Sequence, residues 1–319
     1  MTAFLARQER FERIGSTNDA VRAWLDAGTP EVCLAVADEQ TAGRGRAGRT
    51  WTAPPGAALL LSIGFRPAWL APGHAWRLAA VVSLAMADTA EDVAGLRTGA
   101  VRLKWPNDLV IEADAPEGGG AGRGTGLGTG LGAAAKPVTG PGGGPIRKLG
   151  GVLGEADGLG TDDPRVVVGV GLNAGWARDD FPAAIAPAMT SLAEASGGRP
   201  IDRALVLDGF LSRLEARVEA LRAGRFPMDD WTTRQVTTGR IVRLEGHGSE
   251  PEEVRALGLD PATGALLVAD PTAPGGERAV HAGDVVHVRL PGAPDAADAA
   301  GATGADATDA AVRAPAARV

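Results

Sequence analysis

An α+β protein is predicted by this sequence: helices packed on a mixed β-sheet, followed by a small C-terminal β-barrel. Over residues 1–232, short apolar runs typical of strands alternate with longer segments of helical periodicity. Beyond Trp231 the chain continues in short alternating segments with turn sequences, the pattern of a small antiparallel barrel. We therefore expect a main domain over 1–232, a barrel over 233–291 and a disordered tail over 292–319.

Composition excludes several classes of protein. The 319 residues are 45% apolar, yet no apolar run approaches the roughly 18 residues of a membrane span, so no membrane partner is expected. The start, MTAFLARQERF, is charged where a secretory signal would be apolar, and the single Cys33 forms no internal disulfide. We expect a cytoplasmic protein with Cys33 buried. The net charge of −7 disfavours broad nucleic-acid binding, which depends on clustered cations.

Three helices are expected from capping and periodicity. In STNDAVRAWLDAG the first three side chains can cap a helix, an apolar stripe follows at helical spacing, and Gly28 ends it. AWRLAAVVSLAMADTAEDV has the composition of a buried helix. A further amphipathic helix runs from Asp202, a capping residue, to Gly224.

The strands of the main sheet are expected in VCLAVADEQ, ALLLSIGFRP, VRLKWPNDLVIE, KLGGVLGEA and RVVVGVGLNA. The glycine-rich residues 114–146 separate two of these runs, and we interpret them as a disordered surface insertion without catalytic function. Their GRGTGLG lacks the flanking strand and helix of a phosphate-binding loop. The barrel strands are expected in TTGRIVRLEGHG, VRALGLDPATGALLVAD and ERAVHAGDVVHVRL.

The stretch EQTAGRGRAGRTW, residues 39–51, is a candidate anion site. Its glycines allow the backbone to approach a ligand closely, while Arg44, Arg46 and Arg49 offer forked donors to carboxylate or phosphate. A solvated basic turn or an RNA-binding Arg/Gly segment has a similar composition. The RNA reading is disfavoured because the run is short, lies between strands and ends in Trp51.

Three further motifs carry polar residues at strand ends. KWPND places Asn107 and Asp108 after a proline. KLGGVLGE begins with Lys148, and GVGLN ends with Asn173. Each has an ordinary structural explanation alone: a turn, a solubilising edge lysine and glycines required by tight packing.

Taken together and in this order, STN, EQTAGRGRAGRTW, KWPND, KLGGVLGE and GVGLN resemble the biotin protein ligases, also called biotin–[acetyl-CoA-carboxylase] ligases. The match covers about residues 12–176, and the small barrel, SH3-like in that family, agrees with it. The resemblance implies a biotin/lipoyl ligase-like catalytic domain that uses ATP, Mg²⁺ and biotin. It implies that biotinyl-5′-adenylate and pyrophosphate form first, and that biotin then passes to a lysine of the biotin carboxyl carrier domain of a carboxylase.

The resemblance also implies residue roles. Lys148 matches the catalytic-site lysine, and Arg46 is expected to contact the biotin carboxylate and the adenylate phosphate. Asp108 is the third candidate catalytic residue; it could orient Lys148, help to hold metal and phosphate oxygens, or deprotonate the incoming lysine amine. Asp108 and Asn173 are also candidate magnesium ligands, although the metal ligand set is left unknown. The full set expected at the ligands is Ser16, Thr17, Asn18, Gln40, Arg44, Gly45, Arg46, Arg49, Trp51, Asn107, Lys148, Gly151 and Asn173.

Physical chemistry gives these roles a reason. The biotin carboxylate and the α-phosphate are both anions, and their repulsion in a partly dry site costs several kcal/mol unless cations lie beside them. The arginine loop and Lys148 would supply those cations. Hydroxyl and amide groups at Ser16, Thr17 and Gln40 suit a neutral ureido ring, and Trp51 would stack near the adenine, unless it is a core residue.

Two features depart from the family pattern or limit it. Ala47 stands where relatives often carry a basic or polar residue, so the arginine loop is expected to bring fewer charges to the two anions. The STN motif begins at Ser16, which leaves no room before it for the DNA-binding module of some relatives. We therefore expect no DNA partner, while monomer and homodimer both stay open.

Two other functions share part of this pattern. A lipoate or octanoate protein ligase or transferase resembles this family in fold and uses a comparable lysine, but it needs an apolar tunnel for a flexible acyl chain. A non-catalytic ligand-binding or RNA-binding protein would leave Lys148 and KWPND without a role. The arginine loop and KWPND favour biotin.

Overall fold

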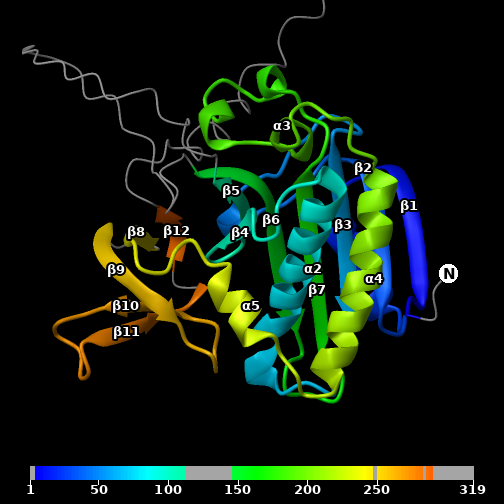
Figure 1. Ribbon diagram of the computed structural model, residues 1–319. Helices are drawn as coiled ribbons and strands as arrows, with labels where there is room; N and C mark the ends of the chain where they lie inside the picture. Colours follow the sequence, from blue (N-terminus) through cyan, green and yellow to red (C-terminus); the bar gives the residue numbers. More distant parts are fainter. Residues whose placement is uncertain (1–3, 113–145, 247–249, 283–284, 290–319) are drawn as a thin grey trace, which may run out of the picture.

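The computed structural model describes residues 4–112, 146–246, 250–282 and 285–289 (Figure 1). The expected insertion over 114–146, apart from its last residue, lies outside the described residues, as does the expected tail over 292–319. Ile146 begins a strand.

A seven-stranded mixed sheet forms the larger part of the molecule. Its strands follow the order β1-β2-β3-β7-β6-β5-β4. β1 and β2 are parallel, and each of the other neighbouring pairs is antiparallel. The strands are β1 (Arg7–Ile14), β2 (Cys33–Gln40), β3 (Ala58–Phe65), β4 (Val101–Lys104), β5 (Asp108–Glu112), β6 (Ile146–Asp157) and β7 (Arg165–Asn173). The predicted mixed sheet is confirmed.

Helices cover both faces of this sheet, because alternate residues of a strand point to opposite sides. α2 (Trp76–Ala94) and α4 (Arg203–Arg222) lie side by side on one face, where Leu34 and Val36 of β2 join their core (Figure 1). α1 (Thr17–Asp26) packs on the other face against Cys33 and Ala35. The shorter helices are α3 (Leu192–Ala195), α5 (Met228–Thr233), and the 3₁₀ turns η1 (Arg46–Gly48), η2 (Pro72–His74), η3 (Arg178–Asp180) and η4 (Ala186–Ala188).

The predicted helix ends are confirmed with one correction. Gly28 and Gly224 follow α1 and α4 with φ of 86° and 77°, a left-handed conformation that favours glycine. The Asp202 carboxylate accepts from the Ala204 N–H at 2.8 Å and caps α4. Ser16 holds the capping position of α1, but its side chain makes no capping hydrogen bond.

Two strand expectations needed correction. β1 was not predicted, because the charges of RQERFERI hide the alternation on this edge strand. The run VRLKWPNDLVIE was expected as one strand-like run, yet it forms the antiparallel hairpin β4–β5; its turn at 105–107 agrees with the turn given as one explanation of KWPND. A proline supplies no N–H to a sheet, so the chain turns at Pro106.

A second, antiparallel sheet follows α5 and confirms the small C-terminal β-structure. Its strand order is β11-β10-β9-β8-β12. The strands are β8 (Ile241–Gly246), β9 (Glu252–Leu259), β10 (Leu266–Ala269), β11 (Glu277–Val280) and β12 (Val285–Arg289). One apolar cluster runs from α2 into this sheet, where it includes Val242 and Leu266. The domain limit between residues 232 and 233 stays a prediction.

Cys33 behaves as expected. It is buried, and burial raises the pKa of its thiol to about 11, so the reactive thiolate is scarce near neutral pH. Among the helices of the described residues, none has the length and apolar character that crossing a membrane requires.

Candidate active site

Two glycines of β7 open one face of the sheet. A Cβ on Gly169 would overlap the Asn18 side chain, and a Cβ on Gly171 would lie 2.5 Å from the Trp51 ring. Both positions therefore need glycine for the close approach of a neighbouring side chain. The glycines of GVGLN do allow tight packing, and the side chains that they admit are those of the candidate site.

Neutral polar side chains meet at the first turn of α1. The Thr17 backbone N–H donates to Gln40 Oε1 at 2.7 Å, and the Thr17 hydroxyl lies 2.7 Å from the Ser62 hydroxyl. Ser62 in turn donates to Asn18 Oδ1 at 2.5 Å. Ser16, Thr17 and Asn18 are all buried. The loop end of β2, the start of α1 and the middle of β3 are thus joined by one polar network.

Glu155 of β6 fixes the orientation of this network. Its Oε2 accepts from Asn18 Nδ2 at 2.6 Å and also lies 3.0 Å from Arg22 and 3.4 Å from Arg44. Because Asn18 Nδ2 points to this carboxylate, Oδ1 must face Ser62. The Arg44 guanidinium donates two hydrogen bonds to the Asp19 carboxylate, a bidentate contact at 2.8 and 2.7 Å, and this hydrogen bonding lowers the pKa of Asp19.

The arginine loop lies between β2 and β3 and folds back on itself. Arg44 and Thr50 form an isolated bridge, and the Gly45 N–H donates to the Arg49 carbonyl at 2.7 Å. Ala47 adopts φ 52°, a strained left-handed conformation for a residue other than glycine. The Arg46 guanidinium donates to the carbonyl of Ala282, which follows β11 in the C-terminal sheet.

A β-bulge turns Lys148 toward the same face. Leu109 pairs with Gly150 but Val110 pairs with Lys148, so Leu149 has no partner on β5. An extra residue of this kind reverses which side the following side chains take. The Lys148 ammonium therefore lies on the face of the sheet to which a side chain at Gly151 would point, 3.6 Å from the position of a Cβ built on Gly151.

Lys148, Lys104 and Asp108 form a compact charged group. Lys148 Nζ lies 2.6 Å from Asp108 Oδ1, and Lys104 Nζ lies 3.5 Å from Oδ2. Burial acts to raise the pKa of Asp108, but the charges of Lys148, Lys104 and Arg49 outweigh it and hold the pKa well below its usual range. Burial lowers the pKa of Lys104, against the pull of Asp108.

The arginine loop reaches this charged group. Burial lowers the pKa of Arg46, the charge of Arg49 lowers it further, and the charge of Asp108 opposes both. Arg46 and Arg49 thus lie within electrostatic range of Asp108, and Lys148 contacts it directly, although the three come from separate parts of the chain. The arrangement can hold two anions close together.

Trp51 lies over glycines of β6 and β7, near Lys148. Its half-buried ring covers Gly171 and Gly151, and Lys148 Nζ lies 5.5 Å from the ring centroid. The indole N–H has no hydrogen-bond partner among the residues that the structure describes. A tryptophan placed so offers both a stacking surface and a donor.

The remaining candidates make structural bonds. Asn107 Nδ2 donates to the Val152 carbonyl at 3.1 Å. Asn173 is buried and donates to the Thr190 carbonyl at 3.0 Å, while the Thr190 N–H donates to the Lys148 carbonyl at 2.9 Å. Both asparagines thus support strands of the site rather than face its charged group directly.

Asp108 is poorly placed to bind magnesium. Two ammonium groups already hold its oxygens. Over the described part of the chain, no group of three or more His, Cys, Asp or Glu side chains is placed to hold a metal ion. The geometry therefore disfavours Asp108 as a metal ligand.

Sequence reasoning missed four residues of the site: Asp19, Ser62, Lys104 and Glu155. Ser62 carried a signal, because it is the polar residue within the apolar run ALLLSIGF. Lys104 and Glu155 begin and end quoted motifs, but nothing in the sequence showed which partners they would meet.

Comparisons with known proteins find similar sequences and a similar fold. Residues 10–173 match the model of the biotin/lipoate A/B protein ligase family. The biotin–[acetyl-CoA-carboxylase] ligase of Mycobacterium tuberculosis (strain ATCC 25618 / H37Rv) is 31% identical over 278 residues, which cover 86% of either chain.

Two further comparisons are more limited. The bifunctional ligase/repressor BirA of Bacillus spizizenii (strain ATCC 23059 / NRRL B-14472 / W23) is 29% identical over 204 residues, 64% of this chain and 51% of that protein. This chain thus spans about half of that relative. A biotin protein ligase from Aquifex aeolicus, solved in complex with biotin and ATP, shares the fold with a TM-score of 0.63 and 22% identity, covering 89% of this chain and 99% of that one.

Proposed function

This chain belongs to the biotin/lipoate A/B protein ligase family, and from that premise we propose that it is an ATP-dependent biotin protein ligase. The proposed protein substrate is the biotin carboxyl carrier domain of a biotin-dependent carboxylase. The observation that carries the proposal is the 2.6 Å contact of Lys148 with Asp108, within electrostatic range of Arg46 and Arg49 and accompanied by a buried neutral network.

In the first step, a carboxylate oxygen of biotin attacks the α-phosphorus of ATP. A bond forms between them, the bond to the bridging oxygen of the β-phosphate breaks, and pyrophosphate leaves. The Arg46 guanidinium and the Lys148 ammonium offset the repulsion between the two anions and stabilise the charge that develops on the phosphate oxygens. Magnesium carried by the nucleotide would neutralise further phosphate charge, and we assign it no protein ligand.

In the second step, the carrier lysine attacks the acyl carbon of the adenylate. The amide bond forms, AMP leaves with the electron pair of the broken bond, and the amine loses a proton. Asp108 is a poor general base for that proton, because its pKa is held well below the usual range. We therefore assign Asp108 the orientation of Lys148.

Biotin is favoured over lipoate or octanoate by the neutral network. Thr17, Asn18, Gln40 and Ser62 place buried hydroxyl and amide groups together. Such groups suit a ring with donors and acceptors, whereas a flexible acyl chain would gain no hydrogen bonds from them. A cytoplasmic location stays a prediction.

The test is exchange of labelled pyrophosphate into ATP in the presence of biotin, lipoate or octanoate. We expect exchange with biotin that far exceeds exchange with the other two acids. Exchange that depends on lipoate or octanoate, with none for biotin, would reject the proposal.

A further inference from the structure

The KWPND turn is held from two sides. On one side, Asn107 Nδ2 donates to the Val152 carbonyl of β6 at 3.1 Å, and the Val152 N–H donates to the Asn107 carbonyl at 2.9 Å. On the other side, the Trp105 backbone N–H donates to the Thr237 hydroxyl at 3.0 Å, and the Trp105 indole donates to the Gly264 carbonyl at 3.0 Å. Thr237 and Gly264 follow the main sheet in the chain and flank β8 and β9.

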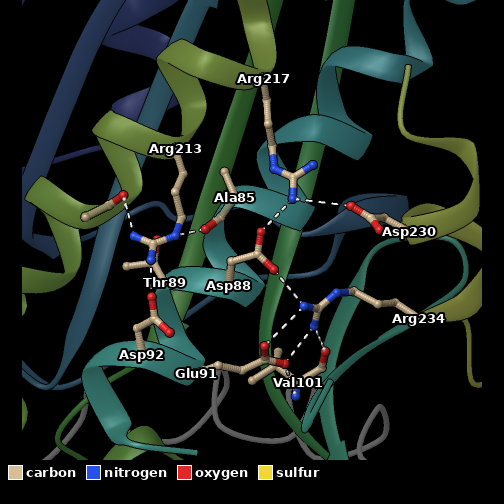
Figure 2. Close-up of polar contacts among 11 residues, drawn as sticks. Ala85, Asp88, Thr89, Glu91, Asp92, Val101, Arg213, Arg217, Asp230 and Arg234 are labelled. Atoms are coloured by element: carbon tan, nitrogen blue, oxygen red, sulfur yellow. Dashed lines mark hydrogen bonds and ion pairs between the residues drawn. The ribbon is translucent and has the colours of Figure 1, made fainter. Parts of the chain in front are cut away.

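The segment that ends at Thr237 is anchored to the main sheet. It lies parallel to β4, with bonds from the Leu103 N–H to the Arg234 carbonyl and from the Val236 N–H to the Leu103 carbonyl, each 2.9 Å. Figure 2 shows the Arg234 guanidinium between Asp88 and Glu91 of α2, at 2.6 and 2.7 Å, with a further bond to the Val101 carbonyl. A buried guanidinium with so many acceptors fixes its own backbone closely.

The turn that carries Gly264 is also held by several hydrogen bonds. The Asp260 carboxylate accepts from the Ala262 N–H at 2.9 Å and from the Thr263 hydroxyl at 2.5 Å. Gly264 has φ 70°, and a Cβ there would lie 2.7 Å from the Trp76 ring. The Trp76 indole donates to the Ala262 carbonyl at 3.2 Å. Two tryptophans of the main domain thus bind one turn of the C-terminal sheet.

This arrangement connects directly to the charged group. Lys104 and Asp108 are the last pair of the β4–β5 hairpin, and Trp105 is the first residue of the turn between them. Asp108 sets the position of the Lys148 ammonium through the 2.6 Å contact.

We infer that Thr237 and the turn over 260–264 are positioning elements for Asp108 and Lys148. The C-terminal sheet acts on adenylate formation through Trp105, at a distance from the reacting atoms. The inference rests on the proposed function, because the reaction that it affects is biotin adenylation.

The test compares Thr237→Val, which keeps the shape but removes the hydroxyl, with Thr237→Ser, which keeps the hydroxyl. In Thr237→Val we expect kcat for biotin-dependent pyrophosphate exchange to fall about ten-fold, since small displacements of catalytic groups are costly, with KM for biotin nearly unchanged. Thr237→Ser should remain close to the wild type. Trp105→Phe removes the indole bond to Gly264 together with part of a buried ring, and is the second variant if Thr237→Val does not fold. It too should lower kcat with KM for biotin nearly unchanged, and an unchanged kcat would count against the inference.

A second readout does not depend on activity: hydrogen exchange of the Trp105 backbone amide. It should become faster in Thr237→Val and not in Thr237→Ser. Unchanged kcat and exchange in Thr237→Val, or an equal loss in Thr237→Ser, overturns the inference. If the wild-type protein has no biotin-dependent activity, the proposed function fails, and amide exchange alone then decides whether Thr237 holds the turn.

Discussion

The two halves of the site differ in how their polar atoms are paired. At the start of α1, neutral hydroxyl and amide groups bond one another, and Glu155 is the charged group that orients them. Around Asp108, by contrast, the ammonium groups of Lys148 and Lys104 share one carboxylate. A neutral network recognises a ligand by its donors and acceptors, whereas an excess of positive charge stabilises anions. We therefore expect changes in the neutral half to alter binding and changes in the charged half to alter the rate.

Loss of the central ammonium should give the largest effect. In Lys148→Ala, adenylate formation is expected to fall by about 10²–10³-fold, because a donor aimed at developing charge is removed. The melting temperature should stay within a few degrees, since Lys148 is partly exposed. Single-turnover formation of labelled adenylate measures the rate. A variant with near-normal turnover contradicts the role given to Lys148.

The arginine loop should follow in size. Arg46→Ala is expected to lower the rate of adenylate formation by about 10²-fold, because its guanidinium helps to offset anion repulsion. Arg13→Ala is the matched control: its largely exposed side chain pairs with Glu39 away from Asp108, and its loss should be neutral. Equal activity of the two variants would remove the arginine loop from the mechanism.

The neutral half is tested through Glu155. Glu155→Gln weakens the contacts to Asn18, Arg22 and Arg44. KM for biotin should therefore rise about ten-fold, which corresponds to the loss of one good hydrogen bond to a charged group, while kcat changes little. Glu12→Gln, on the exposed edge strand β1, is the control and should bind biotin normally. A fall in kcat without a change in KM would contradict this separation.

Asp108 gives a prediction for stability against pH. A carboxyl group whose pKa is lower in the folded protein than in the unfolded chain stabilises the fold. This contribution is complete above the pKa of the unfolded chain, about 3.9, and is lost as the pH falls toward the pKa of the folded protein. Asp108→Asn should thus lower the free energy of unfolding by about 2 kcal/mol at pH 7. Urea unfolding at several pH values should show this difference shrinking only below about pH 4. A difference that shrinks between pH 5 and 7 would contradict the depressed pKa.

The smallest effect is expected from the glycine-rich segment. Glu112 and Ile146 are paired neighbours on β5 and β6, so a short turn can replace residues 115–145. The shortened protein should form adenylate at the wild-type rate, because the segment is expected to have no catalytic role. Lost activity in a folded deletion variant would show that the segment contributes to the reaction.

Sequence reasoning reached most of the fold for a physical reason. Buried strands such as RVVVGVGLNA and the apolar helix at α2 carry strong local patterns, and both appear where expected. β1 escaped because its residues are mostly charged and only one side of an edge strand is covered. The β4–β5 hairpin escaped because its strands are short and its turn lies inside an otherwise strand-like run.

The site was predictable as a set of motifs but not as a geometry. Lys148 stood out in KLGGVLGE, yet the bulge at Leu149 that turns it toward Gly151 arises from pairing between strands. Glu155 meets Asn18 and Arg44 only after residues 137 and 111 positions apart come together. Tertiary contacts of this kind leave no local pattern in a single sequence.

In this protein, we propose, the neutral half of the site binds biotin and the charged half activates it. The most direct measurement determines, for Glu155→Gln and Lys148→Ala side by side, the biotin Kd without ATP and the rate of adenylate formation at saturating biotin. We predict a crossed pattern: weaker binding with a near-normal rate in the first variant, and a much slower reaction with largely retained binding in the second. If both variants lose binding and rate in the same proportion, the separation of the two halves is wrong.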